Sequence, residues 1–206
     1  MDLIVKTFLP AIVLGLASCI GAAQAADLIV DEAVMPMMAE PAGPSLYVQG
    51  LVGLSVTDSL EFSGGPSFPL ELGPAFGATL GINTGLGGLA LEVDAMASMH
   101  EQTETSRYGT QTLMINAKYS FTLTDGFDVF AGAGIGAYGI IEDYDSGTGT
   151  TWATGYQVMV GATYGLTDQL AIIGEYRYQN SFEPIDFDGD GTLANSAVLT
   201  GLKLSF

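Results

Sequence analysis

This chain of 206 residues has few basic residues, few charged residues in total and a single cysteine. Lys and Arg together number 5 against 23 Asp and Glu, which gives a formal net charge of -18. The phosphate backbone of a nucleic acid repels so acidic a chain, and we therefore expect no nucleic-acid partner. Charged residues make up 14% of the sequence, well below the roughly 25% of soluble proteins. The single cysteine, Cys19, excludes an internal disulfide and a cysteine metal site.

A long apolar run is missing after the first 25 residues, because no later segment has the roughly 18 continuous apolar residues of a transmembrane helix. Residues 1–25 combine Lys6, the apolar run FLPAIVLGLA and the small-residue sequence AQA. This combination is typical of a signal peptide cleaved before Ala26. The alternative is lipidation of Cys19, since LASC fits the lipobox of bacterial lipoproteins. Residues 26–44 contain three prolines and predict an irregular N-terminal tail.

From Ser45 onward, apolar and polar residues alternate with a period of two, which is typical of β-strands with two different faces. The connections between the alternating runs are in turn long and short, and Asp125-Gly126 in a short one is a strong hairpin signal. This plan predicts an all-β fold over residues 45–206: an eight-stranded antiparallel transmembrane β-barrel with short periplasmic turns and long extracellular loops. The eight runs are Leu46–Val56, Ala75–Asn83, Leu89–Met99, Thr110–Thr122, Phe127–Ile140, Thr151–Gly165, Gln169–Phe182 and Ala194–Phe206.

Few charges lie on the polar faces of the predicted strands, and they balance. In LAIIGEYRYQ, Glu175 and Arg177 are two residues apart and share a face. A soluble ligand-binding barrel, the competing architecture, would carry many charges on its outer face, so the pattern favours a membrane barrel with its polar face inward. Unpaired charges there are costly, and a substitution such as Lys203→Leu would leave an acid unpaired. The prediction is a lumen ion-pair network of Glu92, Asp94, Lys118, Glu175, Arg177 and Lys203.

Several motifs resemble those of small outer-membrane β-barrel proteins of Gram-negative bacteria. They are AQAADL at the predicted mature start, YVQGLVG, FAGAGIGAYG, GEYRYQ and the ending AVLTGLKLSF. The chain is thus similar to the membrane domain of OmpA and to the opacity and porin-like surface proteins of alphaproteobacteria. The resemblance implies a location in the outer membrane, amid lipid and lipopolysaccharide, and a structural, surface-exposed role without enzymatic activity. It also implies that the barrel-insertion machinery reads the ending, with its alternating residues Leu202, Leu204 and Phe206.

One long loop carries a candidate metal site. In DFDGDG, the acids Asp186, Asp188 and Asp190 stand at positions 1, 3 and 5 of a calcium-loop pattern. Ala197 stands at position 12, where the pattern has a bidentate Glu. The alternatives are therefore a weak calcium site in the fourth long loop and a loop that is merely acidic. We expect no other cofactor.

The only histidine, His100, is expected to be a solvated residue at the rim of the barrel. Catalysis by His100 with Ser98 and Glu101 would need a further group of residues that the sequence does not supply. The alternatives to a structural role are a porin-like small channel, an adhesin and a membrane-embedded lipid-modifying enzyme. An adhesin would bind an extracellular partner through its long loops.

Overall fold

The computed structural model describes residues 43–57, 61–62, 72–101, 107–144, 147–183, 185–186, 190–192 and 194–206. It describes no side chains at 61–62, 101, 142–144, 147–148, 185–186 and 190–192. The predicted signal peptide, Cys19 and most of the predicted tail therefore lie outside the described residues. Among the described residues, no helix has the length and hydropathy needed to cross a bilayer.

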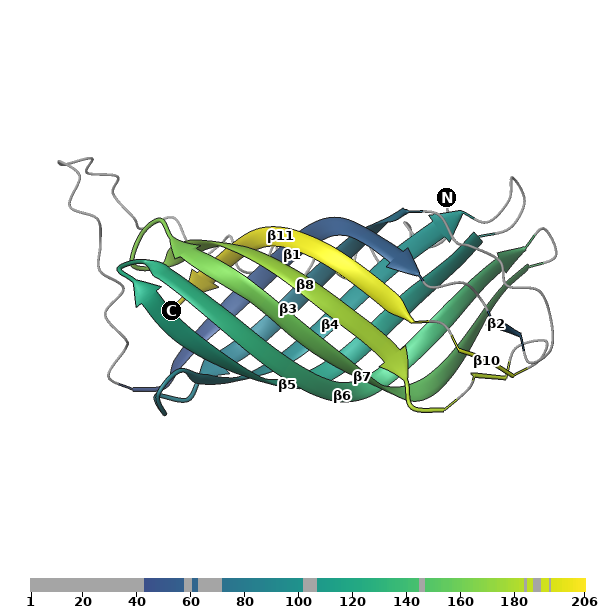
Figure 1. Cartoon of the computed structure of the whole chain (residues 1–206), viewed down its shortest axis with the longest axis horizontal. Helices are drawn as coiled ribbons and strands as arrows, with labels where there is room; N and C mark the ends of the chain where they lie inside the picture. Colours follow the sequence, from purple (N-terminus) through teal and green to yellow (C-terminus); the bar gives the residue numbers. More distant parts are fainter. Residues whose placement is uncertain are drawn as a thin grey trace. The chain divides into compact units, whose positions relative to one another are not determined.

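Eight strands of the described chain close into an antiparallel barrel, which confirms the predicted fold (Figure 1). Around the ring the order is β1-β11-β8-β7-β6-β5-β4-β3, so each strand pairs with its neighbour in sequence and β1 closes the ring with β11. The strands are β1 (Ser45–Thr57), β3 (Gly73–Asn83), β4 (Leu89–Glu101), β5 (Arg107–Thr124), β6 (Phe127–Tyr144), β7 (Gly147–Gly165), β8 (Leu170–Ser181) and β11 (Asn195–Ser205).

The connections differ from the prediction, and the second long one is shortened because β4 continues to Glu101 and β5 begins at Arg107. Three short strands, β2 (Glu61–Phe62), β9 (Ile185–Asp186) and β10 (Asp190–Thr192), form a separate sheet from the first and fourth long connections. The predicted third loop, 141–150, is mostly strand, because β6 and β7 remain paired as far as Tyr144 and Gly147. A transmembrane strand needs only about 9–11 residues. The strands β6 and β7, with 18 and 19 residues, are therefore longer than the bilayer requires.

The alternation of residues places most charged and amide side chains inside the barrel, beside a smaller apolar cluster, and mostly apolar side chains outside. On β5, Ile115 is 66% exposed whereas its neighbour Asn116 is 1% exposed. The same sorting holds along the other barrel strands, whose exposed positions are rich in Leu, Val, Ile and aromatic residues. A continuous apolar outer wall would be unfavourable in water but matches the hydrocarbon of a membrane.

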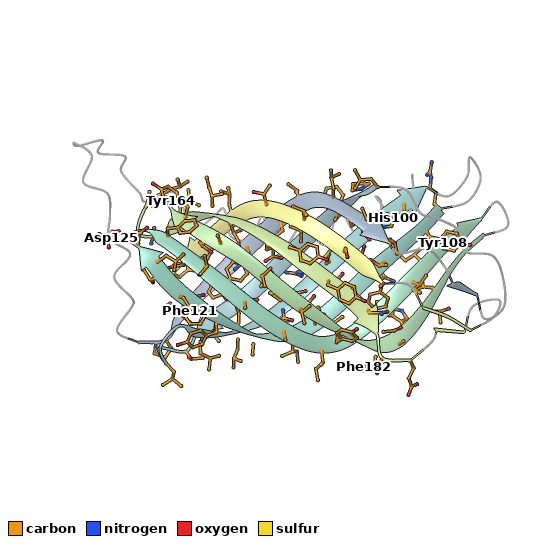
Figure 2. All side chains as sticks on the ribbon, viewed as in Figure 1. His100, Tyr108, Phe121, Asp125, Tyr164 and Phe182 are labelled. Atoms are coloured by element: carbon orange, nitrogen blue, oxygen red, sulfur yellow. The ribbon has the colours of Figure 1, made fainter. Side chains whose placement is uncertain are left out.

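The two ends of the barrel differ in their connections. At one end, the turn end, the short hairpins reverse the chain, and Gly126 of the Asp125-Gly126 turn has a φ of 76°, which favours glycine. Figure 2 shows Asp125, Phe121 and Tyr164 at this end, and His100, Tyr108 and Phe182 at the opposite, loop end. Both ends carry outward aromatic side chains in contact: ring centroids are 4.7 Å apart for Tyr119 and Phe121, and 5.1 Å apart for Tyr156 and Phe182.

Candidate functional site in the barrel lumen

The middle of the lumen is crossed by an ion-pair cluster around Arg177. This buried side chain of β8 places Nη1 3.0 Å from Oδ1 of Asp94 and Nη2 2.6 Å from Oε1 of Glu175. Asp94 belongs to β4, which lies four strands from β8 in either direction around the ring. The Arg177–Asp94 pair therefore joins opposite walls of the barrel. Glu175 is two residues away on the same strand, as the shared face in the sequence indicated.

A chain of amide side chains leads from this cluster toward the loop end. Asp94 accepts hydrogen bonds from Asn116 and from Gln157, the latter at 2.6 Å. Gln179 then donates to Oε1 of Gln157 at 2.9 Å, and Asn195 donates to Oε1 of Gln179 at 3.2 Å. All five side chains are buried. The ion-pair cluster is thus continuous with a neutral hydrogen-bonded network that the sequence pattern did not identify.

A second charged cluster lies nearer the turn end, around Glu92. Its carboxylate forms an ion pair with Lys118 and accepts hydrogen bonds from the Tyr47 hydroxyl at 2.6 Å and from Gln49 at 3.4 Å. The Tyr47 ring is buried between strands, and the ammonium of Lys118 lies 5.1 Å from its centroid. A buried carboxylate with three donors is well compensated for the loss of water.

Lys203 differs from the other five charged residues that the sequence assigned to the network. It is partly exposed, and no carboxylate of the described residues lies within ion-pair distance of its ammonium. Its Nζ instead lies 4.3 Å from the centroid of the Tyr47 ring, as a cation–π contact. The structure therefore brings five of the six predicted residues into ion pairs and places the sixth on an aromatic ring. The reason is register: Lys203 is the third residue from the end of β11, next to the mouth of the lumen.

The Tyr47 side chain fits because its neighbour on β3 is a glycine. A Cβ atom at Gly81 would lie 2.5 Å from Cε2 and from the hydroxyl of Tyr47, which is closer than atoms can approach. We expect Gly81→Ala to lower the free energy of unfolding by about 2 kcal/mol, through displacement of Tyr47 from Glu92. Urea-induced unfolding in lipid bilayers measures the change.

Gly50→Ala is the matched control for this prediction. Gly50 lies on β1 with its Cβ direction open, since no atom comes within 4 Å of the added methyl group. This variant should unfold as the native chain does. Equal stability of Gly81→Ala and Gly50→Ala would contradict the contact between Gly81 and Tyr47.

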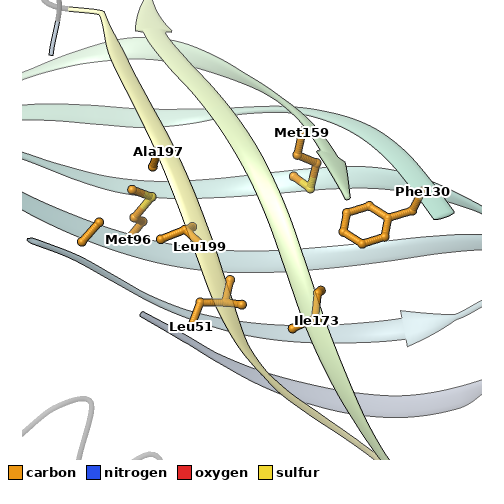
Figure 3. Close-up of a cluster of buried hydrophobic side chains, with 8 residues drawn as sticks. Leu51, Met96, Phe130, Met159, Ile173, Ala197 and Leu199 are labelled. Carbon is orange, nitrogen blue, oxygen red and sulfur yellow. The ribbon is translucent and has the colours of Figure 1, made fainter. Parts of the chain in front are cut away.

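A cluster of apolar side chains lies beside the polar groups of the lumen. Leu51, Met96 and Leu199 pack together on the side of β1, β4 and β11, while Phe130, Met159 and Ile173 lie toward β6 to β8 (Figure 3). Each of these side chains is at most 4% exposed. An eight-stranded barrel has an interior that side chains alone can fill. The lumen is thus occupied by ion pairs, amides and apolar groups.

The prediction that His100 is a solvated rim residue is wrong. His100 is 1% exposed, and its Nε2 lies 3.2 Å from the Ser98 hydroxyl and 3.3 Å from the Ser55 hydroxyl. Strand β4 continues to Glu101, so His100 points into the lumen together with Ser98 rather than into solvent. The sequence spacing could have predicted this inward direction, because His100 lies an even number of residues from the lumen-facing Glu92 and Asp94. Serine and histidine at this distance have the geometry of a nucleophile and its base, but both are closed to solvent.

The other predicted sites are the insertion signal at the end of the chain and the calcium loop. Leu202 and Phe206, of the proposed insertion signal, point outward and are more than half exposed, while Leu204 on the same face is partly exposed. Of the proposed calcium ligands, Asp188 and the side chains of Asp186 and Asp190 lie outside the described residues. Among the described side chains, no group of three or more His, Cys, Asp or Glu could hold a metal ion.

Comparison with known proteins identifies the family. A model of the outer membrane protein beta-barrel domain matches residues 11–206. The structure resembles Neisserial surface protein A with a TM-score of 0.67 and 18% identity, over 80% of this chain and 99% of that one. OprG of Pseudomonas aeruginosa gives a TM-score of 0.49 with 11% identity, over 83% of this chain and 99% of that one. No curated protein sequence matches the chain. The chain belongs to the outer membrane protein beta-barrel domain family and is an integral β-barrel of the outer membrane.

Proposed function

We propose that the protein is a closed structural barrel, which supports the integrity of the cell envelope and presents its loop end at the cell surface without catalysing a reaction. The observation that carries this proposal is the filling of the lumen. The Arg177–Asp94 pair spans the barrel from wall to wall, and the Glu92–Lys118 pair forms a second charged level nearer the periplasm. Leu51, the other apolar side chains and the amides occupy the space beside them.

A porin-like small channel is the second candidate, and the packing of the lumen argues against it. An aqueous channel needs a lumen wider than eight strands provide once the side chains are in place. Moving the Arg177 side chain aside would separate it from Asp94 and Glu175 and leave their charges buried, which is costly. The Arg177–Asp94 pair across the lumen thus favours the closed state.

The buried position of His100 supports the proposed absence of enzymatic activity. A hydrolase or acyltransferase needs a substrate at its nucleophile. The hydroxyls of Ser98 and Ser55 next to His100 are buried, and Ser98 is also hydrogen-bonded to Thr110 at 2.8 Å. This arrangement serves the packing of the barrel. An adhesin function would depend on the extracellular connections.

Solute flux into liposomes tests the proposal directly. Vesicles that contain the folded protein, with folding verified by a boiled and unboiled gel, are placed in an iso-osmotic solution of a small sugar. We expect no swelling beyond that of protein-free vesicles, because ion pairs, amides and apolar side chains occupy the lumen. Swelling comparable to that of a porin would refute the closed barrel and support the channel.

A variant without the central plug shows whether the assay can detect opening. The triple variant Arg177→Ala, Asp94→Ala, Glu175→Ala removes both walls of the ion-pair cluster at once and leaves no buried charge unpaired. It should admit the sugar where the native chain does not. Tyr178→Ala, a change on the outer face of the same strand, is the matched control and should leave the vesicles impermeable.

A further inference from the structure

A polar side chain lies on the lipid-facing wall of the barrel near its extracellular end. Gln111 of β5 shares its outward face with Leu113 and Ile115, which are 54% and 66% exposed. Gln111 itself is only 7% exposed. Its Oε1 is buried and has no hydrogen-bond partner among the described residues. A polar atom buried without a partner costs free energy, so a donor that reached Oε1 would be stabilising.

Trp152 covers Gln111 from two strands away. The register pairs Gln111 with Gly139, and Gly139 with Trp152, so the three residues form one row across β5, β6 and β7. A Cβ atom at Gly139 would lie 2.9 Å from Cε3 and Cζ3 of Trp152 and 3.0 Å from Cγ of Gln111. The glycine thus lets the indole lie across β6 against the carboxamide. The indole nevertheless remains 53% exposed.

The row lies at the level of the lipid headgroups. At the turn end, Phe121 and Tyr164 belong to a belt of outward aromatic side chains, which is typical of the membrane boundary. Gln111 is about ten residues along β5 from Phe121, and a strand crosses the hydrocarbon layer in about 9–11 residues. On β7, Trp152 is about as far from Tyr164 of the same belt. Gln111 and Trp152 therefore meet the outer boundary of the bilayer, where the headgroups of the extracellular leaflet begin.

We propose that Gln111 and Trp152 bind a sugar ring of an outer-leaflet glycolipid, lipopolysaccharide. A sugar offers an apolar C–H face, which an exposed indole accepts, and hydroxyl groups, which a carboxamide can both donate to and accept from. Because Oε1 is buried, a sugar hydroxyl reaches it when the half-exposed indole of Trp152 turns aside, and Oε1 then accepts the hydrogen bond that it lacks. Phospholipid headgroups carry phosphate but no hydroxyl-rich ring in the common classes, and the neutral row offers them no cation.

This inference rests on the proposed envelope role, because a barrel that binds glycolipid headgroups links neighbouring lipids of the outer leaflet to a rigid wall. The closed barrel and the glycolipid site are tested by different experiments, so either proposal can fail without the other. Sugar flux through the lumen decides whether the barrel is closed, whereas headgroup binding occurs on the outer wall and is measured without any flux.

Trp152 is the only tryptophan of the chain, so intrinsic fluorescence reports on this site alone. The folded full-length protein in phosphatidylcholine bicelles is titrated with lipopolysaccharide, and separately with phosphatidylglycerol at equal added charge. We expect a saturable change in the Trp152 emission with lipopolysaccharide and none with phosphatidylglycerol. Equal responses to the two lipids would overturn the proposal in favour of a general interfacial tryptophan.

The substitution Gln111→Leu tests the polar half of the site while retaining the reporter. It should weaken the apparent affinity for lipopolysaccharide about fivefold, the loss of roughly one hydrogen bond. Thr154→Val, on the same outward face of β7 two residues from Trp152, is the matched control and should bind as the native chain does. An unchanged affinity in Gln111→Leu, with folding verified by the gel shift, would show that Gln111 is not part of the site.

Discussion

Replacement of Arg177 by methionine should lower the free energy of unfolding by about 3–5 kcal/mol. Methionine fills a similar volume but removes the cation between Asp94 and Glu175, both buried within ion-pair distance of the guanidinium. Their two negative charges would then lie inside the barrel without a cation, although Asp94 would keep its hydrogen bonds from Asn116 and Gln157. Urea-induced unfolding in lipid bilayers, followed by the loss of the compact band on an unboiled gel, measures the difference.

Removal of the stranded acids should recover most of that loss. The triple variant Arg177→Met, Asp94→Asn, Glu175→Gln retains the shape of the cluster but has no buried charge, and neutral isosteres of buried ion pairs are often nearly as stable as the pair. Arg177→Lys should fall between, because one ammonium cannot reach both carboxylates as the planar guanidinium does. A single variant Arg177→Met as stable as the native chain would show that the pair across the barrel contributes little.

Lys118→Met and Lys203→Leu should differ strongly, although the sequence assigned both lysines to one network. Lys118→Met leaves Glu92 buried with only the hydroxyl of Tyr47 and the amide of Gln49, which should cost about 3 kcal/mol. Lys203→Leu removes a cation–π contact from a partly exposed side chain, which is worth about 1 kcal/mol. The loss of a paired acid expected for Lys203→Leu from the sequence is therefore revised.

The two lysine variants serve as controls for each other, since both remove one positive charge from the same end of the lumen. The same unfolding measurement, at low and at high salt, separates them. The effect of Lys118→Met should persist in salt because the pair is buried. Equal destabilisation by the two variants would mean that Lys203 also pairs with an acid in the membrane.

Much of the barrel follows from local pattern. Alternation with a period of two forces neighbouring side chains to opposite faces, so Ile115 and Asn116 are separated in any strand that contains them. With few and balanced charges on the polar face, the apolar face must meet lipid. The hairpin at Asp125-Gly126 could be predicted from these two residues alone. The prediction of a third long loop was wrong, because the threonine-rich stretch after Gly147 continues the pairing of β6 and β7 beyond the bilayer.

What the sequence by itself determined is therefore the eight strands, their two faces and the set of charges inside. Only the tertiary structure decided which groups meet, because contacts across a closed barrel depend on the register of all eight strands together. Register placed Asp94 opposite Arg177 and kept Lys203 at the mouth. It also aligned Gln111, Gly139 and Trp152 in one row. No local pattern contains these pairs, since they join residues far apart in sequence that ring closure brings together.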